Sequence, residues 1–408
     1  MTAKNNIPAG YKDSSVGIIP QEWEVKPVKD FGKVVTGNTP STAEVSNYGD
    51  EYMFVSPADL SDDKKYILRT EKMLSSKGYA VSRKMPKGAI LYTCIGSTIG
   101  KIGIASCELT SNQQINAVIC DDNNEYFYYA LLFLTGRIKM LAGEQAVPII
   151  NKSDFERIKL AVPPMEEQRK IAEILGVWDE VIEKQSRLIE KLELRKRALM
   201  QRLLTGRTRL PGFTTPWQKV KLGEICEEFV LRNTDDNDYI VLSCTKYNGL
   251  VSSLDYFGKQ IFSDNLRTYK VVPKYHFAYA TNHIEEGSIG YQGSYDYALI
   301  SPMYTVFKAD DTKVDNYFLY TLLKTPLMIY NYQSRIEGSI DRRGGLRWDA
   351  FAGITIKLPS LPEQKAIAEV LTTADDEIAT HRKKLDALRL QKRGLMQQLL
   401  TGKTRVKI

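Results

Sequence analysis

The sequence predicts a duplicated fold with a pseudo-twofold internal repeat, in which two tandem domains are separated by two long helices that form an antiparallel coiled coil. Residues 163–209 and 359–405 align at a constant offset of 196 without a gap, and 22 of their 47 positions are identical. Unrelated segments of average composition would match at about three positions. Because solenoid units span at most roughly 50 residues, a period of about 200 indicates that a whole domain was duplicated together with its helix.

The repeat continues outside the helices at scattered aromatic and apolar positions. Trp23 corresponds to Trp217, and Tyr126 corresponds to Tyr317, whereas the sequences between such anchors differ. Shared anchors with unlike interiors indicate two domains of one fold that recognise different things. The predicted boundaries are 1–162 for the first domain, 163–209 for the central helix, 210–357 for the second domain and 358–408 for the C-terminal helix.

Composition excludes several classes of protein. The 43% hydrophobic content is ordinary for a globular chain, and 408 residues favour two or three domains. Five scattered cysteines without a CxxC spacing favour a reducing cytoplasm, and three widely separated histidines argue against a metal site. We expect a cytoplasmic protein without membrane spans, since no signal pattern begins the chain and the longest apolar run is too short. A net charge of +7 permits a polyanionic partner.

Each repeated segment has the apolar spacing of a coiled-coil helix. Apolar residues recur at alternating intervals of three and four, and the same two positions are polar in both copies. The predicted contact row, here called the seam, consists of Leu175, Trp178, Ile182, Gln185, Ile189, Leu192, Lys196, Leu199 and Leu203 in the first copy, and Leu371, Ala374, Ile378, His381, Leu385, Leu388, Lys392, Leu395 and Leu399 in the second.

The sequence also predicts where these helices begin and end. Pro164 marks the start of the first helix, and the Ser360–Glu363 segment is typical of a capping box. Gly206 and Gly402 mark the C-terminal ends. From Leu175 to Leu203 a helix extends about 42 Å at 1.5 Å per residue.

The matched seams favour pairing of the two helices with each other. If each helix packed only on its own domain, the shared polar interruptions would have no explanation. In an antiparallel pair, a positions face d positions, so we expect Lys196 opposite His381 and Lys392 opposite Gln185. These pairings avoid two facing lysines and would fix the register.

Catalytic motifs are missing or degraded. Gly96–Ile102 resembles a phosphate-binding loop, but it has too few residues between its glycines and Ile102 replaces the magnesium-binding hydroxyl residue. A strand-turn-strand hairpin is the better interpretation. Val162–Met165 lacks the polar and aromatic residues of a methyltransferase motif and is interpreted as the loop entering the helix. No other catalytic motif was found, so we expect a chain that is not an enzyme and binds no metal.

The repeated helix motifs strongly resemble those of one family, the specificity (S) subunits of type I restriction-modification systems. The two copies read EEQRKIAEIL…LRKRALMQRLLTG and PEQKAIAEVL…LRLQKRGLMQQLLTG. Looser similarities are TGNTP at residues 36–40, SNQQ at 111–114 and ISP at 300–302. The resemblance covers the whole chain.

This resemblance implies a non-catalytic, sequence-specific DNA-binding subunit. Each target-recognition domain would read one half of a bipartite double-stranded site, and the paired helices would set the gap. Two methylation (M) subunits would modify adenine, and restriction (R) subunits would join them to cut DNA. S-adenosylmethionine, ATP and Mg would belong to these partners, so that no cofactor is bound by this chain.

The resemblance also implies an α/β (α+β) fold for each target-recognition domain. Short runs rich in β-branched and aromatic residues are consistent with strands of a twisted sheet. These runs are Tyr52–Ser56, Ala89–Ile95, Ile115–Cys120, Tyr239–Ser243 and Tyr304–Lys308.

Candidate DNA-binding residues are polar or basic side chains on expected loops, because base edges and phosphates are bound by such groups. The arginine-rich, glycine-containing segment 341–347 is the strongest candidate. The full set is Lys33, Thr36, Asn38, Ser97, Thr98, Lys101, Asn112, Gln113 and Gln114 in the first domain, and Lys246, Asn248, Asn282, His283, Arg335, Arg342, Arg343 and Arg347 in the second. Asn112 and Gln113 could equally satisfy backbone groups at a strand start.

Two other functions are weighed against DNA recognition. A non-catalytic cytoplasmic scaffold could hold two protein partners and bind no nucleic acid. DNA binding with a steep salt dependence would exclude it, because counterion release is specific to a polyanion. A stand-alone nuclease or methyltransferase is disfavoured by the missing motifs.

Overall fold

The computed structural model describes residues 7–61, 64–143, 147–336 and 345–408. The chain forms two compact units, of which unit 1 comprises Met1–Ile189 with His381–Ile408 and unit 2 comprises Glu190–Thr380. The unit boundary falls inside both long helices, α4 (Met165–Leu203) and α9 (Leu361–Leu399). Each unit therefore contains one domain and a part of each long helix.

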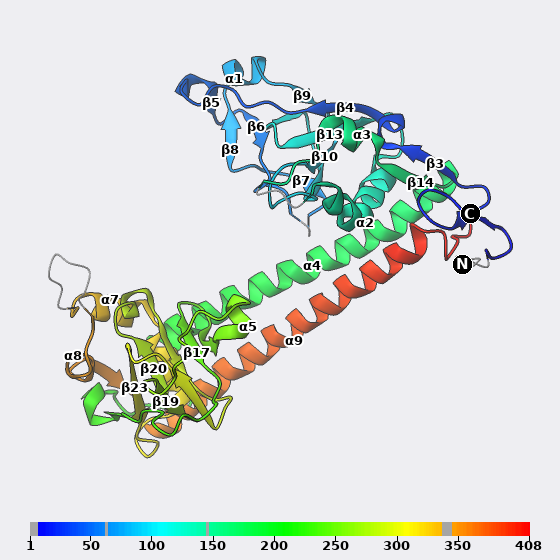
Figure 1. The fold of residues 1–408 in the computed structure, drawn as a ribbon. Coiled ribbons are helices and arrows are strands. Elements are labelled where there is room, and N and C mark those ends of the chain that lie inside the picture. The colour runs from blue at the N-terminus through cyan, green and yellow to red at the C-terminus, as the bar shows by residue number, and fades with distance from the viewer. Residues whose placement is uncertain (1–6, 62–63, 144–146, 337–344) are drawn as a thin grey trace. The chain divides into compact units, whose positions relative to one another are not determined.

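The domain of unit 1 is built on two five-stranded sheets (Figure 1). The first has the order β4-β13-β10-β11-β7 and is antiparallel except for the β11–β7 pair. Its strands are β4 (Gly32–Thr36), β13 (Ile115–Cys120), β10 (Ile90–Thr93), β11 (Ile102–Ala105) and β7 (Tyr66–Ile67). The second consists of β5 (Tyr48–Gly49), β8 (Lys72–Leu74), β6 (Tyr52–Val55), β12 (Leu109–Ser111) and β9 (Lys84–Met85).

Helix α2 (Asn124–Leu141) joins this domain to the long helices of unit 1. The Asn123 side chain caps its N-terminus by accepting a hydrogen bond from the backbone N–H of Tyr126. Its aromatic residues share one core with Trp23 and Leu175, together with residues from the C-terminal end of α9. The remaining elements are β1 (Tyr11–Lys12), β2 (Ile19–Pro20), β3 (Glu24–Pro27), η1 (Val28–Asp30), η2 (Val45–Asn47), α1 (Ser76–Ala80), α3 (Lys152–Arg157) and β14 (Lys159–Val162).

Unit 2 repeats the central strand order with different additions. Its four-stranded sheet has the order β16-β23-β20-β21, which corresponds to β4-β13-β10-β11 of unit 1. These strands are β16 (Cys226–Glu228), β23 (Tyr304–Ala309), β20 (Phe277–Ala280) and β21 (Ile289–Tyr291). The other strands form pairs: β15 (Gln218–Lys221) with β24 (Thr355–Leu358), β17 (Leu242–Thr245) with β18 (Gly249–Ser252), and β19 (Lys270–Pro273) with β22 (Tyr297–Ile300).

The helices of unit 2 are short apart from its parts of α4 and α9. They are η3 (Leu222–Glu224), α5 (Ser253–Phe257), η4 (Ile284–Glu286), α6 (Asn316–Leu323), α7 (Pro326–Gln333) and α8 (Trp348–Ala352). The predicted fold class is confirmed, with two tandem α+β domains and two long helices. Four of the five expected strand runs contain a strand close to the expected bounds, while the fifth strand begins later, at Leu242.

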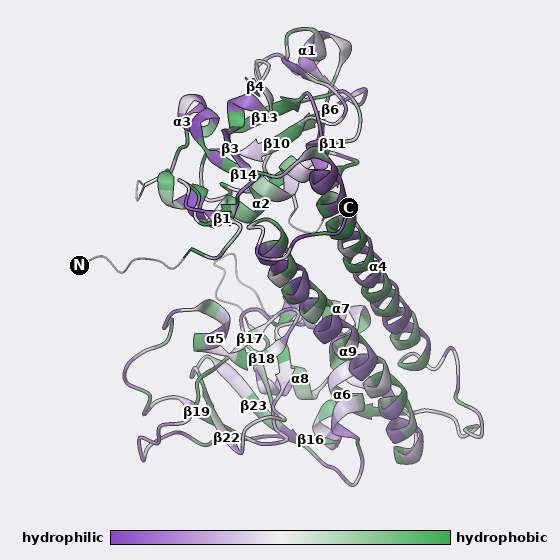
Figure 2. Ribbon diagram, turned by 90° about the vertical axis from the view of Figure 1, so that its right-hand side faces the viewer, coloured by the Kyte–Doolittle hydropathy of each residue, from purple (hydrophilic) through white to green (hydrophobic). Residues whose placement is uncertain are grey.

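Along α4 and α9 the seam positions are all buried or half-buried. Polar and apolar residues alternate around both helices (Figure 2), as expected for helices with one buried face. The helices end as predicted, since Gly206 and Gly402 adopt the left-handed conformation that terminates helices. The expected capping box is wrong, because the Glu363 carboxylate binds Arg209 and does not turn back to the helix start.

The two helices are antiparallel in each unit, but the predicted register is wrong. Lys196 binds Asp375 and Lys392 binds Asp179, so neither lysine faces His381 or Gln185. Instead, Gln185 Nε2 lies 2.8 Å from His381 Nδ1 and donates to the His381 carbonyl oxygen at 3.0 Å. The prediction considered only the residues of the seam. Asp179 and Asp375 lie half-buried beside the seam and pair with the two lysines, which determines the register.

A buried carboxylate near the start of each long helix binds an arginine just beyond the end of the other. In unit 1, Glu167 has no exposed side-chain area and accepts two hydrogen bonds from Arg405, at 2.7 and 2.8 Å. It also accepts one from Trp23 Nε1 at 3.0 Å. In unit 2, Glu363 binds Arg209 in the same two-pronged way. These pairs fasten the helix ends of each unit together.

We predict that Arg405→Met destabilises unit 1 by roughly 2–3 kcal/mol, less than a fully buried pair because the arginine is partly exposed. The substitution leaves the Glu167 carboxylate buried without its cation. Thermal and urea unfolding of the full chain measure the effect. Lys403→Met, in the same tail and exposed, is the control and should change stability by less than about 0.5 kcal/mol. Equal effects of the two substitutions would contradict this account.

Candidate nucleic-acid interface

In unit 1, one edge of the first sheet gathers most of the predicted DNA-binding residues. The antiparallel order places the end of β4, the start of β13, the end of β10 and the start of β11 at the same edge. This edge, here called edge 1, carries Thr36, Asn38, Ser97, Thr98, Lys101, Asn112, Gln113 and Gln114. The residues come from three separate stretches of sequence that the strand pairing brings together.

Several side chains of edge 1 hold the loops in place. Asn38 donates to the Val81 carbonyl at 3.1 Å and accepts from the Arg83 backbone N–H at 2.7 Å. Asn112 accepts from the backbone N–H of Gln114 and donates to its side chain. Asn38 and Asn112 therefore have structural partners already, which leaves them fewer groups for a base.

Other side chains of edge 1 are presented to solvent. Ser97 and Gln113 are exposed, and Gln113 Oε1 accepts a hydrogen bond from Thr39. Thr36 donates to Asn116 at 2.7 Å, and Lys101 donates to the Pro57 carbonyl at 3.2 Å. Edge 1 thus combines side chains that hold the loops in place with a few exposed hydrogen-bond donors and acceptors.

Gly37 permits the close approach of two chain segments at edge 1, one that follows β4 and one at the end of β12. A Cβ atom at this position would lie 2.2 Å from the Asn112 carbonyl oxygen, a distance that no side chain tolerates. The glycine of the TGNTP segment therefore has a packing role.

Lys33 lies apart from edge 1. It pairs with Ile119, near the opposite end of β4 and β13, and its side chain is exposed. Lys33 is close to Thr36 in the sequence, but three residue steps along a strand already separate them by about 10 Å.

In unit 2, the corresponding edge carries Asn282 and His283. Both are exposed, and they follow β20 in the loop that leads to β21. Leu346 N–H donates to the Thr281 carbonyl at 3.0 Å, which brings the exposed Arg347 next to this loop. Arg342 and Arg343 lie outside the described residues. We call this region edge 2.

The hairpin turn between β17 and β18 lies beside the same loop. It contains Lys246 and Asn248, both exposed. Lys324 Nζ donates to the carbonyl oxygens of Lys246 and Gly287, at 2.7 Å in each case, and so ties the turn to the loop. Burial lowers the pKa of Lys324 below its ordinary value. Arg335 is exposed shortly after α7.

A cavity of about 340 Å³ opens at edge 2. Asn282 and His283 line it, together with polar residues that the sequence-based set omitted, such as Ser243 and Thr281. Ser301 also lines it, and its place in the ISP segment was a signal that could have identified it.

The structure bears on one possible phosphate-binding loop and on one possible metal site. Gly96–Ile102 forms the predicted turn between β10 and β11, with Gly96 and Gly100 at positive φ and no helix after it to hold a phosphate. The potential ligand atoms of His283, Glu285 and Glu286 lie within 4.8 Å of one another. Exposed acidic groups commonly come together without an ion, so this group is assigned no metal.

Comparison with known proteins places the chain in a family. Residues 20–194 and 215–390 each match the type I restriction modification DNA specificity domain. The MjaVIII specificity subunit of Methanocaldococcus jannaschii is 26% identical over 428 residues, covering 95% of this chain and 94% of that protein. The HindI specificity subunit of Haemophilus influenzae is 32% identical over 199 residues, which cover 46% of this chain and 42% of that protein.

Solved structures share the fold at low sequence identity. The S subunit of a type I restriction-modification system from M. genitalium has a TM-score of 0.53 at 16% identity, with 98% of both chains covered. A second match is a chain of a type I R-M system that was solved to explain complex assembly and conformational transition. Its TM-score is 0.59 at 15% identity, with 95% of this chain and 99% of that one covered.

The two matched domains extend over most of the chain, which therefore belongs to the type I restriction modification DNA specificity family. Within this class it is a DNA sequence-specificity subunit and not an enzyme, which confirms both predictions from the sequence. Among the described residues, no helix is both long and apolar enough to cross a membrane.

Side chains that hold edge 1 and side chains that are only presented there should differ in their effect on stability. We predict that Asn38→Ala lowers the free energy of unfolding by about 1 kcal/mol, because the Arg83 N–H and the Val81 carbonyl lose their partner. Ser97→Ala should change it by less than about 0.5 kcal/mol. Urea unfolding midpoints measure both, and an Asn38 variant as stable as the Ser97 variant would show that these bonds contribute nothing.

Proposed function

We propose that each unit reads one half of a bipartite double-stranded DNA site and that the helix pair sets the gap between the halves. The observation that carries the proposal is the combination of a common strand order with unlike loops at edges 1 and 2. A shared framework positions the two edges in the same way, while different loops there recognise different sequences.

Edges 1 and 2 are suited to reading base edges in the major groove. Exposed amide and hydroxyl groups such as Gln113 and Ser97 can donate to and accept from bases, and Asn282 offers the same chemistry in unit 2. The arginine side chain of Arg347 suits phosphates or guanine, and Arg342 and Arg343, which are close to it in the sequence, offer the same chemistry. The net charge of +7 favours association with a polyanion.

The catalytic steps are proposed to belong to partner subunits. Two methylation subunits would use S-adenosylmethionine to modify adenine, and restriction subunits would use ATP and Mg to cut DNA. This chain would bind none of these cofactors and would supply the choice of sequence.

Exchange of one domain interior tests the independence of the two readers. Replacing residues 30–150 with the corresponding segment of a related subunit should change one half-site and leave the other half and the gap unchanged. Sequencing of methylated sites in cells that express the variant with its methylation subunits gives the result. A matched exchange of residues 230–345 should alter only the other half. If either exchange altered both halves, the readers would not be independent.

Lengthening both long helices tests whether they set the gap between the two half-sites. Four residues inserted after Leu194 and four after Glu377 preserve the Lys196–Asp375 pair and add about 6 Å and 40° of helical turn. Since one base pair advances 3.4 Å and turns about 35°, we expect the gap to grow by one or two base pairs. The half-sites should stay the same.

Four residues inserted after Gly212, in an exposed stretch beyond α4, provide the control and should leave the gap unchanged. An unchanged gap in an active helix-lengthened variant would show that the helices do not set it.

A further inference from the structure

In each unit, one aspartate of a long helix connects three elements of the fold. Asp179 lies on α4 in unit 1, and Asp375 lies at the equivalent position of α9 in unit 2. Each binds a lysine of the other long helix and a tyrosine of the domain in its unit. We call these two sets of three residues junction 1 and junction 2.

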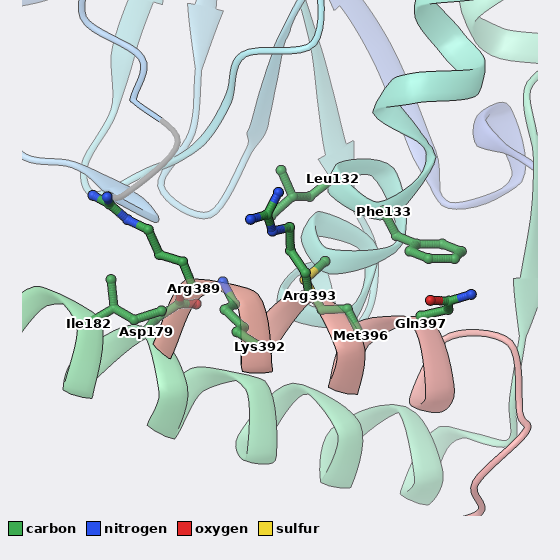
Figure 3. Close-up of a pocket in the computed structure, with 9 residues that line it drawn as sticks. All are labelled: Leu132, Phe133, Asp179, Ile182, Arg389, Lys392, Arg393, Met396 and Gln397. Atoms are coloured by element: carbon green, nitrogen blue, oxygen red, sulfur yellow. Dashed lines mark hydrogen bonds and ion pairs between the residues drawn. The ribbon is translucent and has the colours of Figure 1, made fainter. Parts of the chain in front are cut away.

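Junction 1 is largely buried. Asp179 Oδ2 accepts a hydrogen bond of 2.5 Å from the Tyr129 hydroxyl of α2, and Oδ1 accepts one from Lys392 Nζ of α9. The Lys392 side chain is 9% exposed and that of Asp179 is 19% exposed. Figure 3 shows Asp179 and Lys392 next to each other on the two helices. Burial, and then the Asp179 charge, raise the pKa of Tyr129, so its hydroxyl remains a donor.

Junction 2 has the same division of roles. Asp375 Oδ2 accepts from the Tyr317 hydroxyl of α6, and Oδ1 accepts from Lys196 Nζ of α4 at 2.5 Å. Its aspartate is more exposed, with 42% of the side chain accessible, and the Lys196 side chain is 20% exposed. In both junctions, therefore, one carboxylate oxygen is used by the domain and the other by the opposite helix.

Lys392 also contacts the tyrosine of junction 1 directly. Its Nζ lies 5.2 Å from the centroid of the Tyr129 ring, within the range of a cation–π interaction. Lys65 approaches the same ring at 5.5 Å and pairs with Glu125 at 3.3 Å. Tyr129 is thus held through both its hydroxyl and its ring.

A solvent-accessible pocket of about 700 Å³ lies beside junction 1, lined by Leu132 and Phe133 of α2 and by residues of both long helices (Figure 3). The opposite face of α2 packs in the core that it shares with both long helices. Apolar packing is not directional, whereas a hydrogen bond is, because a displacement of about 1 Å would break it. The bond from Tyr129 to Asp179 therefore adds a positional constraint to the packing of α2.

We propose that Asp179 and Asp375 are positioning residues that fix where each target-recognition domain is seated on the helix pair, and that they thereby determine how strictly the gap between half-sites is measured. The inference rests on the proposed function. A carboxylate suits this role because its two oxygens accept from two directions, so that domain and opposite helix are fixed relative to one residue. A buried ion pair is weak evidence for net stability, so we assign these contacts the role of fixing one arrangement.

Tyr129→Phe is the most direct test, because it removes only the bond between domain and helix and keeps the Asp179–Lys392 pair. The measured quantity is the ratio of methylation rates, in the complex with the methylation subunits, on DNA with the favoured gap and with a gap one base pair longer. We expect this ratio to fall about tenfold, as the loss of one hydrogen bond to a charged group implies.

Tyr126→Phe is the matched control. Tyr126 is also on α2 and is equally buried, but its hydroxyl donates to the Ala161 carbonyl of its own domain at 2.8 Å. Its loss should lower thermal stability and leave the gap ratio unchanged.

In unit 2, Asp375→Asn should lower the gap ratio about threefold, because junction 2 is more exposed. This variant decides the question if Tyr129→Phe fails to fold.

The outcomes separate the inference from the function on which it rests. A folded Tyr129→Phe complex with the wild-type gap ratio would overturn the inference, as would an equal fall of the ratio in Tyr126→Phe. If instead Tyr129→Phe does not fold, a wild-type gap ratio in Asp375→Asn would overturn it. A wild-type complex that methylates without preference for any bipartite sequence would refute the proposed function itself.

Discussion

The pairing of two equivalent helices from one chain is the constraint on which the rest of the structure depends. When two equivalent helices pack antiparallel, equivalent residues face each other near the middle, as Gln185 and His381 do. A contact on one side of the middle can then recur on the other side, so that it occurs once in each unit. Lys392–Asp179 and Lys196–Asp375 are such a pair of contacts, and so are Arg405–Glu167 and Arg209–Glu363.

The duplicated contacts are not identical, and the differences follow from the domains. In unit 1, Trp23 donates to the buried Glu167. In unit 2, the indole of Trp217 lies near the Arg209 guanidinium, 5.9 Å from the ring centroid, and its N–H has no partner among the described residues. Junction 1 is likewise more buried than junction 2. Duplication thus kept the charged pairs on the helices, while the contacts made by each domain diverged.

Within the domains, too, some features are repeated in both units and others differ. The strand order β4-β13-β10-β11 recurs as β16-β23-β20-β21, and it brings loops from distant parts of the sequence to one edge. The strands that form this frame are mostly buried, and their residues must pack. The loops at edges 1 and 2 contain more exposed residues, so apart from positions that hold them in place, such as Gly37, fewer of their residues are fixed by packing.

The sequence by itself determined the duplication, the two long helices, their seam and the absence of catalytic motifs, because these features are local or periodic. It also indicated the family through the helix motifs. Only the tertiary structure decided the register, since the aspartates that bind Lys196 and Lys392 lie beside the seam and carry no periodic signal. The same holds for edge 1, where strand pairing brings Thr39 to Gln113. Lys33, which is nearer to Thr39 in the sequence, lies toward the other end of β4.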